Sequence, residues 1–389
     1  MKEKIFIIIL AFLSAIAPLA TDMYLPALSA VQQSFNTSEF YTQLSIASFF
    51  IAFAFGQLIY GPLSDVYGRK LPIIAGMLIF IISSFLCFLV DNIYTFIALR
   101  FLQAFGGCAG VVIARAIVSD CFDKQKAIEV FSLMMICSSV APMISPSIGG
   151  MLLKYFSWQS IFVTLFIVGI VLLLLCIFYI KESNNDRIKF SFFNIYQAYK
   201  VTMSRAGFLV YVVCSSLVMS SMFAYIAGSS FVFVDVFGVS SQTYALIFGA
   251  NSLGFMIAAR LNIYFTNKFG VDKIVFMGFV IMLINSILLI IFSNNFYTFT
   301  AFLFFTLCML GFITPNLVTK AMGKAKQYSG SASAVLGSFQ FIFAGFATFL
   351  VGFMDANTSF KLACIISGFC VFASLTYIIR TNIVKMIKK

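Results

Sequence analysis

The sequence predicts an all-α membrane protein with twelve transmembrane helices in two six-helix bundles. Of the 389 residues, 62% are hydrophobic and only 10% are charged, whereas soluble domains average about 25% charged residues. Apolar runs recur along the whole chain, each near the roughly 20 residues that cross the hydrocarbon core. Lys and Arg fall in the short segments between these runs, which is how membrane topology is encoded.

The first apolar run follows Met1-Lys2-Glu3-Lys4. It continues beyond the short apolar core of a signal peptide, so we expect it to be the first span. Every span should be helical, because a helix satisfies all backbone groups within its own segment. The expected spans are 5–25, 41–62, 71–90, 93–116, 127–153, 158–180, 207–235, 241–265, 272–293, 295–319, 328–353 and 358–380.

The positions of Lys and Arg predict the orientation. With these spans, 22 of the 25 Lys and Arg residues lie on one side of the membrane. Only Lys154 and Lys361 lie on the other side, and Arg100 lies within a span. The positive-inside rule then places both termini in the cytoplasm. We expect a multi-pass protein of a bacterial inner membrane.

The longest connection divides the chain into two halves. We expect an N-terminal bundle at 1–180, a cytoplasmic linker at 181–206 and a C-terminal bundle at 207–389. The linker has an amphipathic stretch around 192–199, which we expect to lie along the membrane surface. Two bundles with a solute site between them are typical of transporters.

The composition argues against several other functions. The chain has no His, and its nine Cys include no CxxC pair, so we expect neither a metal site nor a cofactor. The basic residues form no single patch, which argues against nucleic-acid binding. We see no nucleophile–base set and no Gly-rich phosphate loop, and no ring of charges suits a channel. We therefore expect a monomeric transporter, not an enzyme, with a small-molecule substrate, protons and the lipid bilayer as its partners.

Two ionisable residues stand out because charges at membrane depth are costly. Asp22 lies about 26 Å from the cytoplasmic start of the first span, and Arg100 lies about 10 Å from the outer start of the fourth. Both should therefore lie in the outer half of the membrane. Two interpretations remain open: a static ion pair between two helices, or proton exchange at Asp22 with Arg100 tuning its proton affinity.

Segment 61–70 (GPLSDVYGRK) resembles the cytoplasmic loop motif G-x-L-x-D-x-x-G-R-K of the major facilitator superfamily. The resemblance implies a conformational latch in which the Asp faces the start of the eleventh span, near Tyr328, and the Arg pairs with an acid below the fourth span. An anion at a helix N-terminus is favourable on dipole grounds. Segment 267–273 is a degraded copy, so we expect a one-sided latch. The latch residues are Gly61, Asp65, Gly68, Arg69 and Asp120.

Two further segments resemble motifs of the same superfamily. Segment 99–107 (LRFLQAFGG) resembles the fourth-span motif, whose Arg is linked to proton transfer and corresponds to Arg100. Segment 141–150 (APMISPSIGG) resembles the fifth-span motif of antiporters, although Ala141 stands where many members have Gly. Prolines bend such a helix and small residues let another helix approach. The corresponding residues are Pro142, Pro146, Gly149 and Gly150.

Segments 21–28 (TDMYLPAL) and 224–233 (AYIAGSSFVF) resemble the Bcr/CflA drug-resistance efflux transporters, and the similarity extends essentially from end to end. It implies proton-coupled export of antibiotics and other small amphipathic compounds by alternating access. Ser14 stands two turns before Asp22, where some related carriers have a second acid, so we expect a single acid in this span. Polar or soft residues within spans are candidates for substrate binding, and we expect fewer than half to touch substrate: Tyr24, Gln103, Met134, Tyr225, Asn251, Asn316 and Gln340.

Two related functions remain open alternatives. The same fold could be dedicated to exporting a siderophore or another metabolite of the cell. It could also serve a proton-driven importer, although the fifth-span motif argues against import.

Overall fold

The computed structural model describes residues 2–184, 192–205, 207–325, 329–354 and 358–387. Within these residues every regular element is helical, and twelve helices are long and apolar enough to cross a membrane. This confirms the predicted all-α membrane fold and the predicted number of spans. By their internal contacts the residues form two compact units.

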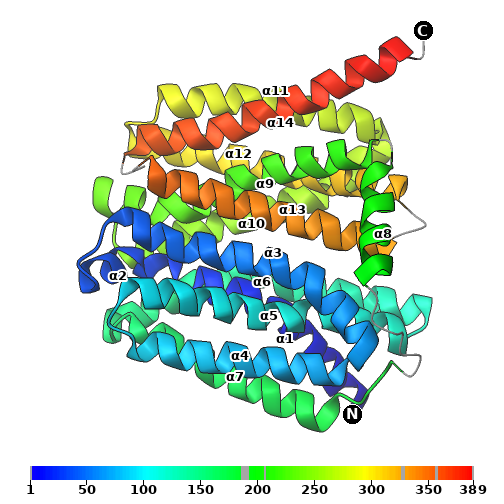
Figure 1. The fold of residues 1–389 in the computed structure, drawn as a ribbon. Coiled ribbons are helices and arrows are strands. Elements are labelled where there is room, and N and C mark those ends of the chain that lie inside the picture. Colours follow the sequence, from blue (N-terminus) through cyan, green and yellow to red (C-terminus); the bar gives the residue numbers. More distant parts are fainter. Residues whose placement is uncertain (1, 185–191, 206, 326–328, 355–357, 388–389) are drawn as a thin grey trace. The chain divides into compact units, whose positions relative to one another are not determined.

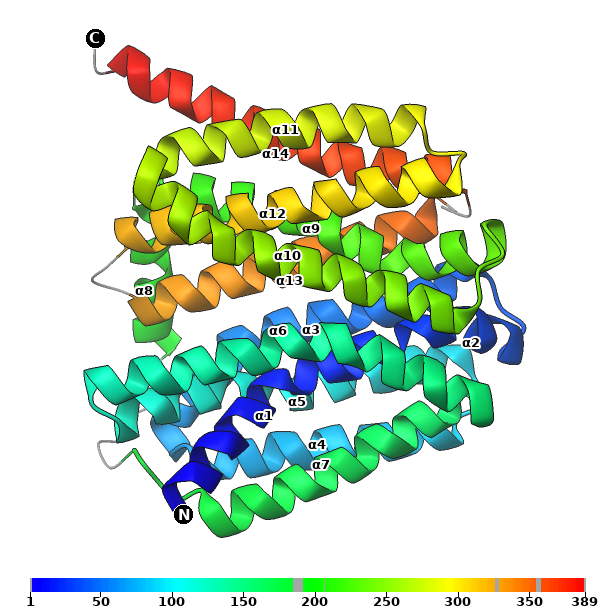
Figure 2. The same cartoon turned by 180° about the vertical axis from the view of Figure 1, so that it is seen from behind.

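The first unit comprises Met1–Phe192 together with Ser240–Gly249, the beginning of α10. In both views the N-terminus and the end of α7 lie at the same end of this unit, as an even number of crossings requires (Figures 1 and 2). Its helices are α1 (Lys2–Asp22), a 3₁₀ turn (Leu25–Ala27), α2 (Leu28–Ser34), α3 (Glu39–Tyr67), α4 (Lys70–Leu89), α5 (Ile93–Cys121), α6 (Lys124–Tyr155) and α7 (Gln159–Tyr179).

The second unit comprises Phe193–Val239 and Ala250–Lys389. On α8, Tyr199 and Met203 pack against a buried cluster that includes Phe208 and Ala321, whereas Phe193 and Tyr196 are exposed. The expected amphipathic stretch is therefore a helix with one packed face. The helices are α8 (Phe192–Ser204), α9 (Phe208–Phe231), a π-helical turn (Val232–Val236), α10 (Ser241–Phe269), α11 (Val271–Ile291), α12 (Phe296–Lys324), α13 (Ser329–Phe353) and α14 (Ser359–Ile387).

The two units repeat a local design. Segment 92–96 (NIYTF) begins α5, and segment 295–299 (NFYTF) begins α12. The Asn92 Oδ1 accepts hydrogen bonds from the backbone N–H groups of the second and third following residues at 2.8 and 3.3 Å, and the Asn295 Oδ1 does the same at 3.0 and 3.2 Å. Each side chain thus satisfies donors that a helix start leaves unpaired.

A second repeated feature precedes α4 and α11. Gly68 has φ +88° and Gly270 has φ +83°, a region that favours glycine. Each glycine lies between two consecutive spans, so both units reverse the chain in the same way at this point.

Several helices differ in length from the expected spans. Helix α3 continues five residues past the expected end at 62, and α5 continues five residues past 116. Polar residues such as Ser64 and Ser119 occupy these extensions, so the helices continue beyond the apolar segment. Helix α1 ends earlier than expected, at Asp22. Pro26 follows within the 3₁₀ turn and has no N–H with which to continue an α-helix.

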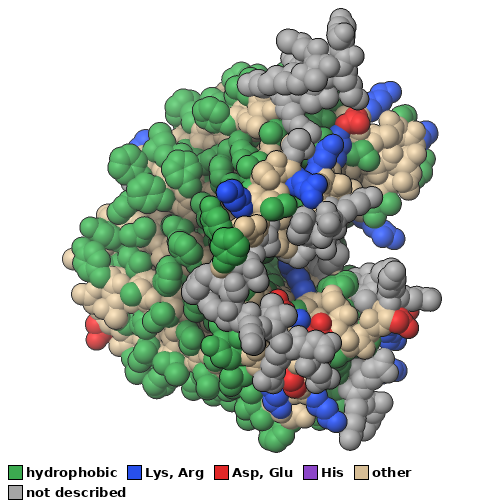
Figure 3. Space-filling model, turned by 45° about the vertical axis from the view of Figure 1, so that its right-hand side comes forward, with side chains coloured by type: hydrophobic (Ala, Val, Ile, Leu, Met, Phe, Trp, Pro, Cys, Tyr) green, Lys and Arg blue, Asp and Glu red, His purple; other side chains and the backbone are tan. Residues whose placement is uncertain are grey.

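The surface of each unit fits a lipid environment. On the face that Figure 3 shows, hydrophobic side chains cover the broad flank, and most of the visible Lys, Arg, Asp and Glu side chains lie at the right-hand end. Phe178 is 76% exposed and Tyr297 is 78% exposed. Such large exposed apolar side chains are expected where lipid replaces water as the solvent.

Candidate functional site

Arg100 is completely buried inside the first unit. Its Nη1 donates to the carbonyl oxygen of Ala20 on α1 at 3.2 Å and to Oε1 of Gln103 on its own helix. Its Nε and Nη2 are buried and make no hydrogen bond with any described residue. These two atoms form the edge of a guanidinium that binds a carboxylate in bidentate fashion. Arg100 therefore holds the end of α1 while one donor edge stays open.

Aromatic rings surround the Arg100 guanidinium. Its central carbon lies 4.9 Å from the ring centre of Tyr24, 4.6 Å from Phe49 and 5.6 Å from Phe162. At such distances the negative face of a ring attracts a cation, and more strongly where water is excluded. Cation–π contacts therefore stabilise the buried charge in place of an anion.

Asp22 is also buried, with 4% of its surface exposed. In the part of the chain that the structure describes, it forms no ion pair with Arg100. The static bridge weighed from the sequence is therefore not formed in this conformation. An acid at this depth without a cationic partner is costly when ionised, so Asp22 needs either a proton or a rearrangement that brings a cation to it.

The antiporter-type segment of α6 lies directly against the end of α1. A Cβ on Gly149 would overlap the carbonyl oxygen of Met23, the residue after Asp22. Gly149 and Gly150 are both buried, as is Pro146, while Pro142 is half-buried. The small side of α6 thus reaches the segment that carries Asp22, a proximity that the sequence did not predict.

Three candidate substrate-binding residues lie in the first unit, and all are buried. The Tyr24 hydroxyl and the Ser45 hydroxyl lie 3.0 Å apart, and Gln103 Nε2 donates to Ser84 Oγ at 2.7 Å. Met134 is 3% exposed, and its carbonyl oxygen accepts a hydrogen bond from Ser14 at 3.2 Å. In this conformation Tyr24 and Gln103 join helices of their own bundle.

The second unit holds the other candidates. Asn251 Nδ2 donates to the Tyr225 hydroxyl at 2.9 Å, and both residues are buried. Asn316 Nδ2 donates to Asn262 Oδ1 at 2.9 Å, joining α12 to α10. Gln340 on α13 is half-buried. The structure therefore brings two of these candidates together, Tyr225 and Asn251, and pairs Asn316 with Asn262, which was not predicted.

Four of the five latch residues lie together where α3 ends, α4 begins and α5 ends: Asp65, Gly68, Arg69 and Asp120. Arg69 Nε lies 2.8 Å from Asp120 Oδ2, the pair that the family resemblance implied. Arg69 Nη1 lies 2.5 Å from Asp65 Oδ1 and donates to Ser64 Oγ at 2.7 Å. Gly61 lies within α3 with open space where a Cβ would be. Tyr328, expected to face Asp65, lies outside the described residues.

Glu182, just after α7, completes this cluster and was missed in the sequence. Its carboxylate accepts hydrogen bonds from the backbone N–H of Arg69 at 2.8 Å and of Lys70 at 3.2 Å, at the start of α4. The N–H groups of Ser183 and Asn184 also donate to it, at 3.1 and 3.0 Å. Partial burial alone would raise the pKa of the Glu182 carboxyl, but these backbone donors outweigh it and hold the pKa below its usual range.

The residues after Glu182 extend the same connection. Ser183 Oγ donates to Asp120 Oδ2 at 3.1 Å, and Asn184 Nδ2 donates to the carbonyl oxygen of Asp65 at 3.1 Å. The beginning of the linker is thus attached to three helix ends of the first unit. The available sequence signal was an acid two residues after the expected end of an apolar span at 180.

The degraded loop copy in the second unit carries an ion pair of its own. Asp272 in the first turn of α11 pairs with Lys320 near the end of α12. The Lys320 ammonium lies 5.6 Å from the ring centre of Tyr211 and 5.9 Å from that of Tyr377. In the first unit the cation, Arg69, follows the glycine turn, and the acid, Asp120, lies near the end of α5. In the second unit the acid follows the glycine turn and the cation lies near the end of α12.

Comparisons with known sequences agree with this geometry. The model of the Major Facilitator Superfamily matches residues 10–349. The chain is 31% identical to the uncharacterized MFS-type transporter YdgK of Bacillus subtilis, over 97% of this chain and 95% of that protein. It is 27% identical to the bicyclomycin resistance protein homolog of Haemophilus influenzae, over 97% and 96% of the two chains. It is 30% identical to the multidrug resistance protein MdtL of Escherichia coli O157:H7, over 59% and 58%.

Solved structures share the fold at low sequence identity. The nucleoside transporter NupG has a TM-score of 0.78 at 12% identity, with 96% of this chain and 98% of that chain covered. The D-xylose–proton symporter has a TM-score of 0.75 at 14% identity, with 96% and 97% covered. Because the family model spans most of the chain and the fold agrees with it, this protein belongs to the Major Facilitator Superfamily and is a membrane transporter, not an enzyme.

Proposed function

We propose that this chain is a proton-coupled antiporter that exports small amphipathic organic compounds by alternating access. The observation that carries the proposal is Asp22, a buried acid within the first span that forms no ion pair with a described residue. The bicyclomycin resistance homologue and MdtL support drugs as the substrate class. The protein would lie in a bacterial inner membrane with both termini in the cytoplasm. The distribution of Lys and Arg supports this orientation.

In this proposal Asp22 carries the proton and Arg100 responds to its charge. Protonated Asp22 can remain buried without a partner. Once it loses the proton, the carboxylate needs a cation, and the open Nε and Nη2 edge of Arg100 is a suitable bidentate donor. Because Arg100 is bonded to Ala20 on the same helix end, such a movement would also shift α1. Through this shift of α1, binding of substrate and protonation of Asp22 would compete with one another.

The contact between Gly149 and Met23 would transmit that movement to α6. A side chain at Gly149 would separate the two segments, so the glycine keeps α6 in contact with the proton-carrying part of α1. The ion pairs Arg69–Asp120 and Asp272–Lys320 would hold the cytoplasmic helix ends of each unit through the cycle.

The test measures drug-induced proton movement in everted vesicles that contain the native chain, Asp22→Asn or Asp91→Asn. Asp91 is an exposed acid and serves as the matched control. A panel of amphipathic antibiotics and siderophores should contain a compound that dissipates a pH gradient with the native chain and Asp91→Asn but not with Asp22→Asn. Proton coupling that survives in Asp22→Asn would assign the proton to another group. A response to siderophores alone would favour the dedicated exporter.

A further inference from the structure

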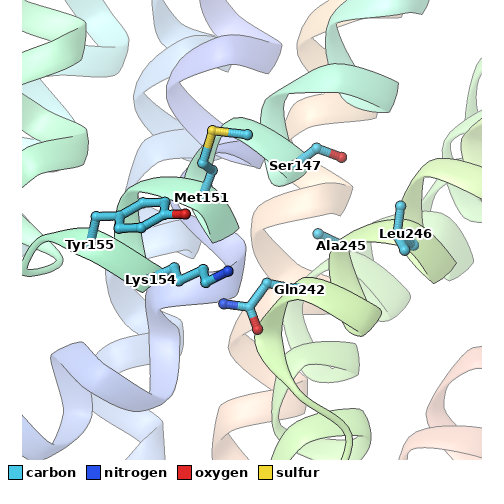
Figure 4. A pocket seen from close by; sticks show the side chains of 7 residues that line it. All are labelled: Ser147, Met151, Lys154, Tyr155, Gln242, Ala245 and Leu246. Carbon is cyan, nitrogen blue, oxygen red and sulfur yellow. The ribbon is translucent and has the colours of Figure 1, made fainter.

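A cavity of about 290 Å³ lies within the first unit, between the end of α6 and the beginning of α10. Figure 4 shows α6 contributing four side chains and α10 contributing three. Neither Asp22, Arg100 nor the latch residues line it, and of the antiporter-type segment of α6 only Ser147 does. The lining residues are Ser147, Met151, Lys154, Tyr155, Gln242, Ala245 and Leu246.

The lining is amphipathic. The ends of the Lys154 and Gln242 side chains point toward one another in Figure 4 and form a polar corner. Met151 and Leu246, which are 64% and 68% exposed, provide apolar surface beside it. A ligand that fits this lining has an anionic or strongly polar head and an apolar tail.

Among the described residues, no acid neutralises Lys154. In the part of the chain that the structure describes, it forms no ion pair with a carboxylate, and its ammonium lies 5.4 Å from the ring centre of Tyr155. It is also one of only two Lys or Arg residues expected on the side of the membrane that is depleted of cations. A Lys at this place and beside a cavity therefore indicates an anionic ligand.

Lys154 also lies at the depth of lipid headgroups. It is the second-to-last residue of the α6 span, and Tyr155 ends that span. Tyr side chains at the ends of spans are typical of the membrane–water interface, and a Lys there can reach a lipid phosphate. An acyl chain entering from the bilayer would meet Met151 and Leu246.

We propose that this cavity binds an anionic phospholipid of the outer leaflet, with its headgroup phosphate on Lys154 and Gln242 and an acyl chain along Met151 and Leu246. Charge complementarity at Lys154 selects an anionic over a zwitterionic headgroup. The site does not depend on which compound the protein transports.

Tryptophan fluorescence provides the measurement. Trp158 is the only Trp in the chain, but it is buried against Phe35 and Phe162 and does not line the cavity. A reporter protein with Trp158→Phe and Tyr155→Trp places the one fluorophore on the lining, where a bound lipid with brominated acyl chains should quench it. The reporter protein is reconstituted in phosphatidylcholine vesicles with equal fractions of brominated phosphatidylglycerol or brominated phosphatidylcholine. Quenching should be stronger with phosphatidylglycerol. Lys154→Gln should reduce this preference about fivefold, the factor that corresponds to roughly 1 kcal/mol for one Lys near anionic lipid.

Two variants serve as controls. Lys154→Arg keeps the charge and should keep the preference. Lys361→Gln removes the other cation expected on this side and should leave the preference unchanged. Equal quenching by the two lipids in the reporter protein would overturn the proposal, as would an unchanged preference when Lys154→Gln is added to it. Loss of drug transport in Lys154→Gln with an unchanged lipid preference would assign the cavity to the substrate path instead.

Discussion

At the residue scale, two neighbouring glycines in α6 have different surroundings. A Cβ on Gly149 would overlap the carbonyl oxygen of Met23, whereas the nearest atom to a Cβ on Gly150 is the carbonyl oxygen of Ser241 at 3.5 Å, an ordinary contact. Both glycines lie within a helix, where alanine is otherwise favoured by roughly 0.5–1 kcal/mol. The close approach of α6 to the Asp22 segment therefore depends on Gly149 and not on Gly150.

We expect Gly149→Ala to lower stability by about 1–3 kcal/mol because overpacking forces backbone shifts, and to reduce transport because α6 moves away from Met23. Gly150→Ala should be neutral or slightly stabilising. Thermal unfolding in detergent and proton-coupled transport in vesicles measure the two effects. Equal behaviour of the two variants would show that the Met23 contact is not needed.

Glu182 gives a prediction for pH. Its pKa is lower in the folded protein than in the unfolded chain, so its contribution to stability is complete above the unfolded value of about 4.3. The contribution is lost as the pH falls through the lower folded value. Glu182→Gln should therefore lower the melting temperature at pH 7, and the difference from the native protein should shrink below about pH 4. A difference that is constant with pH would mean that the carboxylate charge is not what bonds the start of α4.

Gly68 adds a matched pair at the same place. Its φ of +88° disfavours any residue with a Cβ, and a Cβ there would also overlap the Glu182 carboxylate. Gly68→Ala should lower the free energy of unfolding by about 1–3 kcal/mol through backbone strain. It should also break some of the hydrogen bonds that Glu182 accepts. Gly61→Ala should be tolerated, because Gly61 has open space at that position. Melting temperatures of the two variants compare these costs directly.

At the scale of elements, the two ion pairs at the helix ends have opposite arrangements of sign. Arg69 precedes α4 and meets Asp120 on α5, while Asp272 begins α11 and meets Lys320 on α12. An ion pair that acts only by attraction tolerates an exchange of its two partners. A pair whose cation also makes directional bonds does not, because a carboxylate cannot replace a planar guanidinium.

We therefore expect different results from charge exchange in the two units. Asp272→Lys alone should impair transport or stability by placing two cations together, and Asp272→Lys with Lys320→Asp should restore part of it, less the ring contacts that the Lys320 ammonium makes with Tyr211 and Tyr377. Arg69→Asp with Asp120→Arg should remain impaired, because Arg69 also bonds Asp65 and Ser64. Transport rate and melting temperature of single and double variants make the comparison. Full recovery of transport and stability by the double variant of the first unit would show that Arg69 acts only through its charge.

The elements also show what could be predicted from the sequence. The spans were predictable because hydropathy and the placement of Lys and Arg are local properties of the chain. The bond between Glu182 and Arg69 joins residues 113 positions apart, and that between Asp272 and Lys320 joins residues 48 apart. Such pairs depend on packing that no local pattern contains. Likewise, Tyr24 lies in the turn after α1 and Gln103 in a helix that is apolar nearly all round, so periodicity could not show that they face their own bundle.

At the scale of the whole molecule, an even number of spans requires defined loops to lie on defined sides of the membrane. Cys121 is an exposed thiol at the end of α5, on the side predicted to be cytoplasmic. Lys361, near the start of α14, is predicted to lie on the opposite side. A membrane-impermeant maleimide should therefore label Cys121 in everted vesicles but not in intact cells. Lys361→Cys in a Cys121→Ser background should show the reverse, and Cys121→Ser alone measures labelling of the remaining thiols. If both positions are labelled from the same side, the number of spans between them is even rather than the seven that the structure has, and both the bundle boundaries and the cytoplasmic placement of the Arg69 cluster must change.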